Sequence, residues 1–183
     1  AKVARAPNDG YTLLLHHIGM ATAPALYRSL SYKVLDDFEY VGMINEVPMT
    51  VIGKPSLPAN NWAELMKWLE ANKGKINLAN AGLGAASHLC GLLFQQSLKI
   101  DMTTVPYKGT APAMTDLLGG QVDIMCDQTT NTTQQIEGGK VKAYAVTTLK
   151  PLTTPALSKL PTLDAAGLKG FNVSIWHGMY APK

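Results

Sequence analysis

Apolar and polar residues alternate along this chain in short blocks, some with the two-residue period of a strand and some with the period of a helix. The clearest helix pattern follows Asn61, with apolar residues at positions 62, 65, 66 and 69. This i, i+3, i+4, i+7 spacing predicts a helix with one buried face. Asn61 and Glu64 have the spacing of a capping box, which predicts where that helix begins.

Strand and helix patterns follow one another along most of the chain, which is typical of βαβ units with a largely parallel sheet. The strand patterns predict strands at 11–15, 40–44, 49–52, 75–78, 122–127, 142–147 and 174–180. Between them, helices are expected at 22–28, 111–118 and 163–166, and after positions 61, 87 and 128. We expect the first strand to be buried. Pro48 cannot donate to a sheet ladder, so we expect a bend or crossing point there.

One stretch, 77–89, runs from a short apolar strand through small residues into a helix pattern. Gly82 and Gly84 allow the backbone to approach a ligand closely, and the helix that begins near Ser87 would point unpaired N–H groups at it. This pattern favours an anion-binding turn. Glycine-rich turns also serve only to reverse the chain, and the stretch alone does not separate the two interpretations.

Several polar residues fall where predicted strands end. In open α/β sheets ligands bind beyond the carboxyl ends of the strands, so the set predicts a binding edge. Two alternatives to ligand binding stay open. His16 and His17 could be loop histidines that bond to the backbone, and Asp127 could cap the next helix. The strand-end residues are His16, His17, Ser87, Tyr107, Lys108, Thr110, Asp127 and Thr129.

Composition limits the class of protein. With 183 residues, 46% hydrophobic and 16% charged, the chain can bury a sizeable core and is not disordered. Its net charge is only +3, and the basic residues are scattered, so no nucleic-acid partner is predicted. No apolar run reaches the roughly 18 residues of a membrane span.

The sequence contains none of the common catalytic or metal-binding motifs. Ser87 and His88 are adjacent, so they do not form a nucleophile–base pair, and Asp127 is the one strand-end acid. The glycine turn lacks the third glycine of a dinucleotide fingerprint. Cys90 and Cys126 lack the spacing of a zinc site, and their pairing stays open. We therefore predict no catalytic residues, no metal and no cofactor.

Five motifs in order along the whole chain resemble the Bug family, the periplasmic solute-binding receptors of tripartite tricarboxylate transporters. They lie at 6–15, 80–88, 105–109, 117–123 and 176–182. The resemblance implies an α/β, type II periplasmic binding protein-like fold with two lobes, built of βαβ units with mixed, mostly parallel sheets. It implies a periplasmic protein, not embedded in the membrane, that delivers a small organic carboxylate to the membrane components of the transporter.

The resemblance also implies how the chain is divided. Residues 1–47 and 176–183 would form part of lobe one, and residues 48–175 would form lobe two, with the hinge near Pro48 and Trp176. Compared with the family pattern, the chain is expected to be truncated at both ends.

In the family, backbone amides and ordered waters at two strand-to-helix turns, one from each lobe, hold the ligand carboxylate. Here His16 and His17 stand where members commonly have small residues, so a di- or tricarboxylate and an aromatic acid such as nicotinate are both expected ligands. The alternatives are an α/β enzyme acting on a small carboxylate and the sensing lobe of a regulator. Carried over by position, the ligand-binding residues are His16, His17, Ile18, Gly19, Ala81, Gly82, Ala85, Ala86, Ser87, Tyr107, Lys108 and Asp127.

Overall fold

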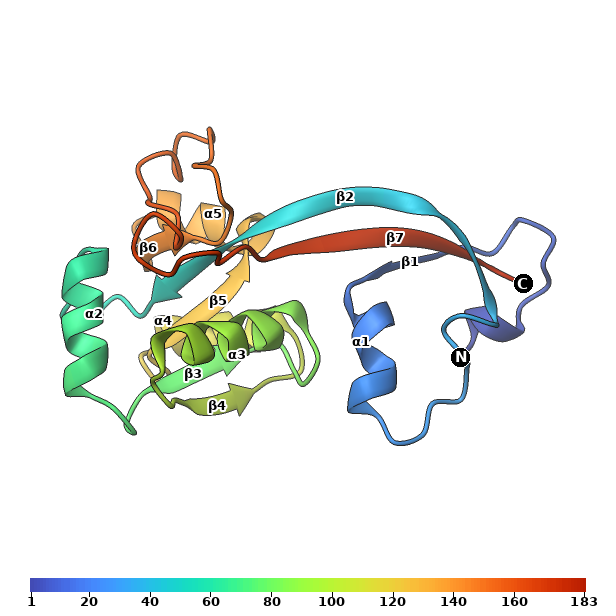
Figure 1. Cartoon of the computed structure of the whole chain (residues 1–183), viewed down its shortest axis with the longest axis horizontal. Coiled ribbons are helices and arrows are strands. Elements are labelled where there is room, and N and C mark those ends of the chain that lie inside the picture. Colours follow the sequence, from blue (N-terminus) through green and yellow to red (C-terminus); the bar gives the residue numbers. More distant parts are fainter. The chain divides into compact units, whose positions relative to one another are not determined.

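The computed structural model describes all 183 residues, and the chain divides into two compact units (Figure 1). Unit 1 comprises Ala1–Glu46 and Ile175–Lys183, and unit 2 comprises Val47–Ser174. These boundaries fall one residue before those expected for the two lobes. Neither unit contains a helix with the length and apolar character needed to cross a membrane.

Unit 1 is built on three neighbouring strands in the order β1–β7–β2. Strand β1 (Leu14–His17) pairs antiparallel with β7 (Ser174–Pro182), and β2 (Phe38–Gly53) begins in this unit. The other elements are a 3₁₀ turn at Val3–Arg5 and helix α1 at Gly19–Leu26.

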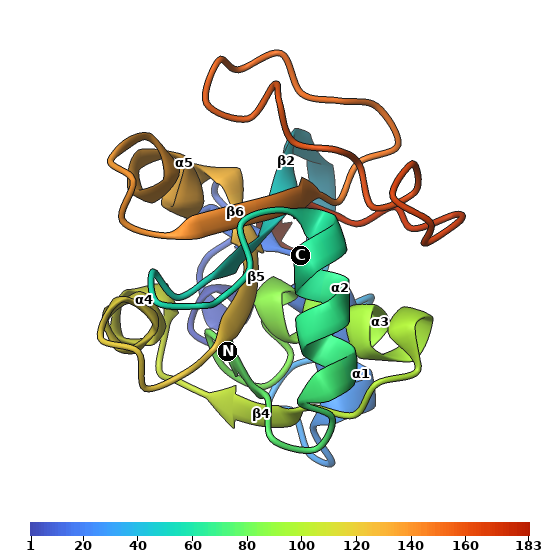
Figure 2. The ribbon, with the colours of Figure 1, turned by 90° about the vertical axis from the view of Figure 1, so that its left-hand side faces the viewer.

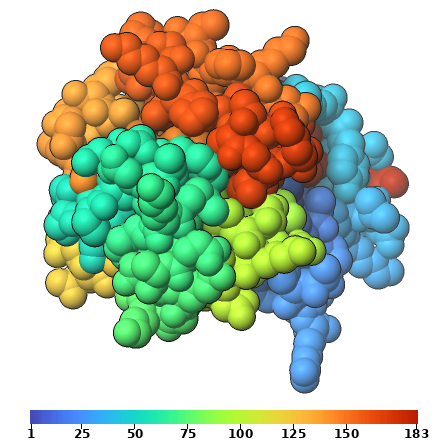
Figure 3. Space-filling view, turned by 60° about the vertical axis from the view of Figure 1, so that its left-hand side comes forward, coloured from blue at the N-terminus to red at the C-terminus, as the bar shows by residue number.

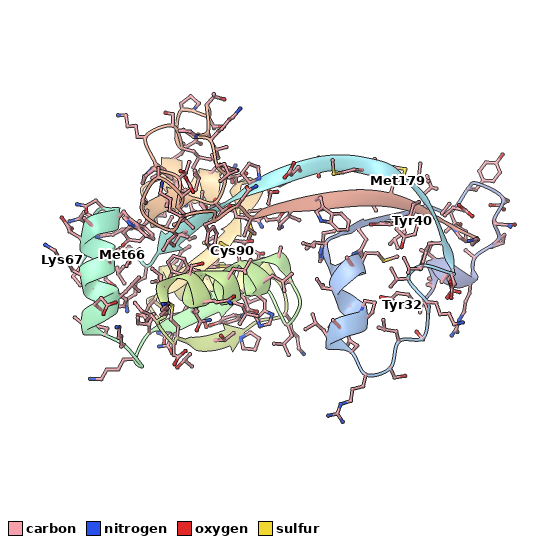
Figure 4. All side chains as sticks on the ribbon, in the orientation of Figure 1. Tyr32, Tyr40, Met66, Lys67, Cys90 and Met179 are labelled. Atoms are coloured by element: carbon pink, nitrogen blue, oxygen red, sulfur yellow. A yellow bond between two sulfur atoms is a disulfide. The ribbon has the colours of Figure 1, made fainter.

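The core of unit 1 is small. Met20, Phe38 and Tyr180 are its buried residues, and the Phe38 and Tyr180 rings meet edge to face with centroids 6.4 Å apart. Tyr32 packs against this core, with its ring centroid 5.9 Å from that of Phe38 (Figure 4). Aromatic pairs with these geometries add to the stability gained by burial.

The expectation of a buried first strand at 11–15 is wrong. Strand β1 begins at Leu14, Tyr11 is 93% exposed, and Leu15 is 58% exposed. The apolar residues of unit 1 gather around Met20, and the side chains of Tyr11 and Leu15 lie outside that cluster. An apolar run shows that a segment suits burial, but only packing partners bury it.

Unit 2 contains a five-stranded mixed sheet in the order β6–β2–β5–β3–β4. Strand β3 (Asn77–Asn80) runs parallel to β4 (Thr103–Pro106) and to β5 (Ile124–Gln128). Strand β2 runs antiparallel to both β5 and β6 (Lys142–Val146). The reversed strand β2 therefore ends at the edge of the sheet opposite to that where β3, β4 and β5 end.

Four helices cover the two faces of this sheet. Figure 2 shows α2 (Trp62–Ala71) and α3 (Ala86–Leu98) on one side, and α4 (Thr110–Leu118) and α5 (Thr129–Glu137) on the other. Helix α2 and the segment after β6 form much of the surface of unit 2 seen in Figure 3. The predicted helix at 163–166 is wrong, since these residues form turns.

Strand β2 is not interrupted at Pro48, since it continues from Phe38 to Gly53, but the chain passes from unit 1 to unit 2 between Glu46 and Val47, next to this proline. The pairing of β2 with β5 begins at Met49, one residue later. Met49 also donates its N–H to Thr147 Oγ1 at 3.1 Å. Pro48 precedes the β2–β5 ladder, so its missing N–H takes no bond from that ladder.

The two cysteines, whose pairing the sequence left open, form a disulfide in unit 2. Cys90 of α3 and Cys126 of β5 have Cα atoms 6.1 Å apart, and both side chains are buried. This Cα separation lies within the range that disulfides require. The bridge closes a sequence separation of 36 residues.

Candidate functional site

Three helices of unit 2 begin at the sheet edge where β3, β4 and β5 end, and none of the three is capped by a side chain. The N-cap residues of α3, α4 and α5 are Ala85, Gly109 and Gln128, and none makes a side-chain capping bond. Helix α2 begins at the opposite edge and is capped, since Asn61 Oδ1 accepts from the N–H of Glu64 at 2.9 Å. We call the first edge, with its three helix N-termini, the carboxyl edge. Uncapped N-termini leave orphan N–H donors there.

The β3–α3 turn is fixed by bonds to its own side chains. The N–H of Ala81 donates to Ser87 Oγ, and the N–H of Gly82 donates to Asn80 Oδ1, both at 2.9 Å. Gly82 has a φ of +128°, and a Cβ there would lie 3.1 Å from the carbonyl oxygen of Tyr107. Both the backbone conformation and the available space therefore require glycine at this position.

The same turn uses a histidine as an acceptor. The N–H of Gly84 donates to His88 Nδ1 at 3.1 Å, so the neutral ring carries its proton on Nε2. Burial lowers the pKa of His88. The N–H of Leu89 donates to the carbonyl of Ala85 at 3.1 Å, which leaves the N–H groups of 86–88 as the unused donors of α3.

Hydrogen bonds join the three loops of the carboxyl edge. The N–H of Tyr107 donates to the carbonyl of Asn80, and the N–H of Gly109 donates to that of Ala81, both at 2.9 Å. Across the remaining gap, Asn131 Nδ2 of α5 donates to Thr110 Oγ1 of α4 at 3.5 Å. The starts of α3, α4 and α5 are thus held together as one polar surface.

Asp127 lies at the centre of these contacts and is almost fully buried. Its carboxylate accepts from the N–H of Gln128 at 2.8 Å and from Asn131 Nδ2 at 3.4 Å. Burial raises the pKa of Asp127, while hydrogen bonds from Gln128, Thr110 and Asn131 act in the opposite direction. The N-cap of α5 is Gln128, so the interpretation of Asp127 as the cap is wrong. Asp127 instead connects α4 and α5.

Tyr107 and Lys108 differ in their surroundings. The Tyr107 hydroxyl donates to Asp116 Oδ2 of α4 at 2.7 Å. Burial, together with the Asp116 carboxylate, raises the pKa of Tyr107 to about 12. Lys108 is exposed, immediately before the N-cap of α4. Tyr107 is therefore anchored to the protein, whereas the Lys108 ammonium lies in solvent.

The candidate turn of unit 1 lies between β1 and α1, and there a histidine occupies the helix start. The N–H of Gly19 donates to His17 Nδ1 at 3.0 Å, so Nε2 of the neutral ring carries the proton. Ile18 is the N-cap residue and makes no side-chain cap. The His16 ring lies against the His17 ring with centroids 4.5 Å apart, and His16 Nδ1 donates to the carbonyl of His17 at 3.1 Å.

A third imidazole belongs to this group. His177 lies opposite His17 in the β1–β7 register, with ring centroids 6.2 Å apart, and its Nδ1 donates to Asn45 Oδ1 at 2.8 Å. Burial, and then the charges of His16 and His177, lower the pKa of His17. No group of three or more His, Cys, Asp or Glu side chains is arranged to hold a metal ion.

Sequence reasoning missed three residues that shape the carboxyl edge: Asn80, His88 and Asn131. Asn80 has a side-chain nitrogen that is buried without a hydrogen-bond partner, while its oxygen fixes Gly82. An asparagine two residues before a glycine is a recognised turn signal and could have identified it. His88 bonds to Gly84 and Asn131 bonds to Asp127, each only four residues away, so a search for side chains near the helix starts could have found both. The bond from Asn131 to Thr110 joins distant segments, which no local pattern specifies.

The structure thus distributes the predicted residues over two sites. His16, His17, Ile18 and Gly19 lie together at the start of α1. The residues predicted from 81 to 127 lie together at the carboxyl edge of unit 2, where the backbone of the β3–α3 turn and of the first turn of α3 supplies the donors. The carboxyl edge offers unused backbone N–H donors at the start of α3, and donors of this kind suit an anion. In unit 1 the Gly19 N–H is bonded to His17, so the donor there is the Nε2–H of that ring.

Comparison with known proteins agrees with this chemistry. The family model described as "Tripartite tricarboxylate transporter family receptor" matches residues 1–183. The structure of the periplasmic binding protein BugD is similar to the whole chain, with 58% identity and a TM-score of 0.91. An R. palustris protein solved with adipate has 33% identity and a TM-score of 0.92, also over the whole chain. MatC from Rhodopseudomonas palustris, with bound malate, has 38% identity and a TM-score of 0.86 over 99% of the chain.

The chain is shorter than the proteins it resembles. It covers 60% of the BugD chain, 60% of the adipate-bound protein and 61% of MatC. It spans about half the length of the curated relatives it matches, with shares of 52%, 54% and 55% for three of them.

Proposed function

Because this chain belongs to the tripartite tricarboxylate transporter receptor family, we propose that it binds a small organic carboxylate in the periplasm and presents it to a transporter. The family is one of binding receptors, not of enzymes. Its partners, on this proposal, are the carboxylate and the membrane components of a tripartite tricarboxylate transporter.

One observation carries the proposal: the helices that begin at the carboxyl edge of unit 2 are uncapped, whereas α2 at the opposite edge is capped. Uncapped N–H groups and the positive end of the helix dipole favour a bound anion. The turn residues Ala81, Gly82 and Gly84 already bond within the protein. We therefore assign the ligand contacts of α3 to the N–H groups of 86–88.

Each of the other predicted residues of unit 2 receives a more specific role. Ala81, Gly82 and Ala85 hold the turn in place. Tyr107 connects the turn to α4, since its N–H donates to Asn80 and its hydroxyl to Asp116. Asp127 connects α4 and α5 through Thr110 and Asn131. We propose that these residues position the donors and that Asp127 does not touch the carboxylate, because two like charges would repel each other. Lys108, being exposed, adds positive potential near the start of α4.

In unit 1 we propose that His17 donates a hydrogen bond to the ligand from Nε2. Its Nδ1 is occupied by Gly19, and one face of its ring is covered by His16, which leaves Nε2–H as the available donor. This favours an oxygen ligand over an aromatic ring stacked on His17.

The identity of the carboxylate is proposed at the level of class. Two solved relatives, with 33% and 38% identity, bind adipate and malate, and both compounds are aliphatic dicarboxylates. Together with the unused N–H donors at the start of α3, which suit oxygen acceptors, this supports an aliphatic dicarboxylate for the present chain. An aromatic acid such as nicotinate is the second candidate, supported by the His16, His17 and His177 rings.

The proposal is tested by a thermal-shift screen followed by calorimetry, with malate, adipate, citrate, nicotinate and acetate as ligands. A ligand that binds only the folded state raises the unfolding midpoint by mass action. We expect malate or adipate to give the largest rise and to be recovered unchanged. A larger rise with nicotinate would select the aromatic candidate. Conversion of any compound would support an enzyme, and a flat screen would overturn the proposal.

A further inference from the structure

The disulfide of unit 2 joins two parts of the carboxyl edge. Cys90 lies four residues, about one helical turn, after Ala86, the first residue of α3, so both lie on the same side of that helix. Cys126 immediately precedes Asp127 on β5. Figure 4 shows Cys90 on the side of α3 that faces β5. The bond thus links the helix with the unused N–H donors to the strand that leads into α5.

A second close contact presses α3 onto the sheet. A Cβ at Gly91 would lie 2.9 Å from Leu78 Cδ2 of β3, so the helix backbone approaches β3 as closely as a glycine permits. Gly91 holds α3 against β3, and the neighbouring Cys90 ties it to β5. Successive residues of α3 therefore fix the helix against two parallel strands whose ends form the carboxyl edge.

We propose that the Cys90–Cys126 disulfide is a positioning element of the anion-binding edge: it holds the first turn of α3 in register with the ends of β3 and β5. This inference rests on the proposed carboxylate site as far as binding is concerned, which is its functional half. Its structural half, that the disulfide holds α3 in place, is independent of any ligand. The bond lies in the interior, with both side chains at most 1% exposed, so it acts as a permanent link in the folded protein.

The physical reason is a difference in sulfur–sulfur separation. Bonded sulfurs lie about 2 Å apart, whereas unbonded heavy atoms in contact lie roughly 3.5–4 Å apart. In a densely packed interior, two free thiols must therefore rotate away or push α3 from β5. The bonds from Ala81 to Ser87 and from Gly84 to His88 connect the turn to α3 and would lengthen with any such shift. Binding geometry is sensitive to displacements of this size.

Hydrogen exchange tests the structural half without a ligand. In a Cys90→Ala/Cys126→Ala variant, the bonded amides of Ala81 and Leu89 should exchange at least tenfold faster, normalised to Ile52 in the centre of the sheet. The matched control is Leu69→Ala, which removes a fully buried side chain of α2 and so lowers stability away from this edge. Normalised rates that change less than twofold in the cysteine variant, or equally in both variants, would overturn the proposal.

Calorimetric titration with malate, and with adipate in parallel, tests the functional half. The cysteine variant should bind about tenfold more weakly, while Leu69→Ala should stay within twofold of the parent chain at a temperature where all are folded. By reciprocity, if the dithiol form binds malate more weakly than the disulfide form, saturating malate should shift the thiol–disulfide equilibrium towards the disulfide by that ratio of affinities. Equal affinities would refute the positioning role. If the parent chain binds neither compound, the assignment of an aliphatic dicarboxylate fails, and the exchange result still decides whether the disulfide holds α3.

Discussion

Replacement of Gly82 by alanine probes the β3–α3 turn more directly than any other single change. Gly82 has a φ of +128°, a region that L-residues rarely occupy, and its Cβ would meet the carbonyl oxygen of Tyr107 at 3.1 Å. Its N–H also donates to Asn80 Oδ1. The substitution keeps this N–H, so its effect comes from the backbone conformation and the close contact.

The size of the effect follows from these two features. Holding a non-glycine residue in a sparsely populated region costs about 1–3 kcal/mol, and the tight contact with Tyr107 adds to this. We expect Gly82→Ala to lower the free energy of unfolding by about 2–3 kcal/mol. If the turn relaxes instead, the first turn of α3 is displaced. Affinity for the carboxylate should then fall at least tenfold, which equals about 1.4 kcal/mol.

The matched control is Gly139→Ala, at the end of α5. Gly139 has a φ of +63°, and a Cβ there would meet no other atom within 4 Å, so the change should cost about 1 kcal/mol and leave affinity intact. Urea denaturation measures stability, and calorimetry with malate or adipate measures affinity. The reasoning is refuted if Gly82→Ala loses no more stability than Gly139→Ala and also binds as tightly as the parent.

Three other outcomes are expected. Asn61→Ala should lower the free energy of unfolding by about 1 kcal/mol, because it removes the α2 cap, without changing affinity; a twofold weaker affinity would contradict this. Because folding lowers the pKa of His17 and of His88, the unfolded chain takes up these protons at a higher pH than the folded chain does. The free energy of unfolding should therefore be at its full value above pH 6.5 and should fall as the pH drops below it. His88→Gln should flatten that fall in urea midpoints measured between pH 7.5 and 5, and an unchanged slope would exclude His88. Asp127→Asn should strengthen dicarboxylate binding by about two- to tenfold, an electrostatic gain on the order of 1 kcal/mol. Weaker binding would contradict this and would show that the bonds accepted from Gln128 and Asn131 are needed to position the donors.

The pattern of the sequence determined the local features that depend on a few neighbouring residues. The capping box at Asn61 and Glu64 is present, although the Glu64 carboxylate accepts from the N–H of Asn60 and not from that of Asn61. The glycine turn before α3 and the alternation of strands and helices are also present. Each of these follows from backbone conformation or side-chain reach within one segment, which is information that the sequence carries locally.

Tertiary structure decided everything that depends on partners far away in the chain. Segment 11–15 is apolar, but Tyr11, Leu13 and Leu15 are exposed. Pro48 lies inside strand β2, just before the pairing with β5 begins at Met49. Asp127 could equally have capped α5, and only the positions of Thr110 and Asn131 show that it connects two helices.

The cysteines are the plainest example of this division. Their number and spacing excluded a zinc site, but a disulfide requires two Cα atoms within a few ångströms, a distance that no sequence pattern specifies. The fold brings Cys90 and Cys126 to 6.1 Å across α3 and β5. The sequence by itself therefore determined the type of most elements and the family, because these depend on local pattern and motif. The tertiary structure alone decided which donors remain unbonded, because that depends on how distant segments pack.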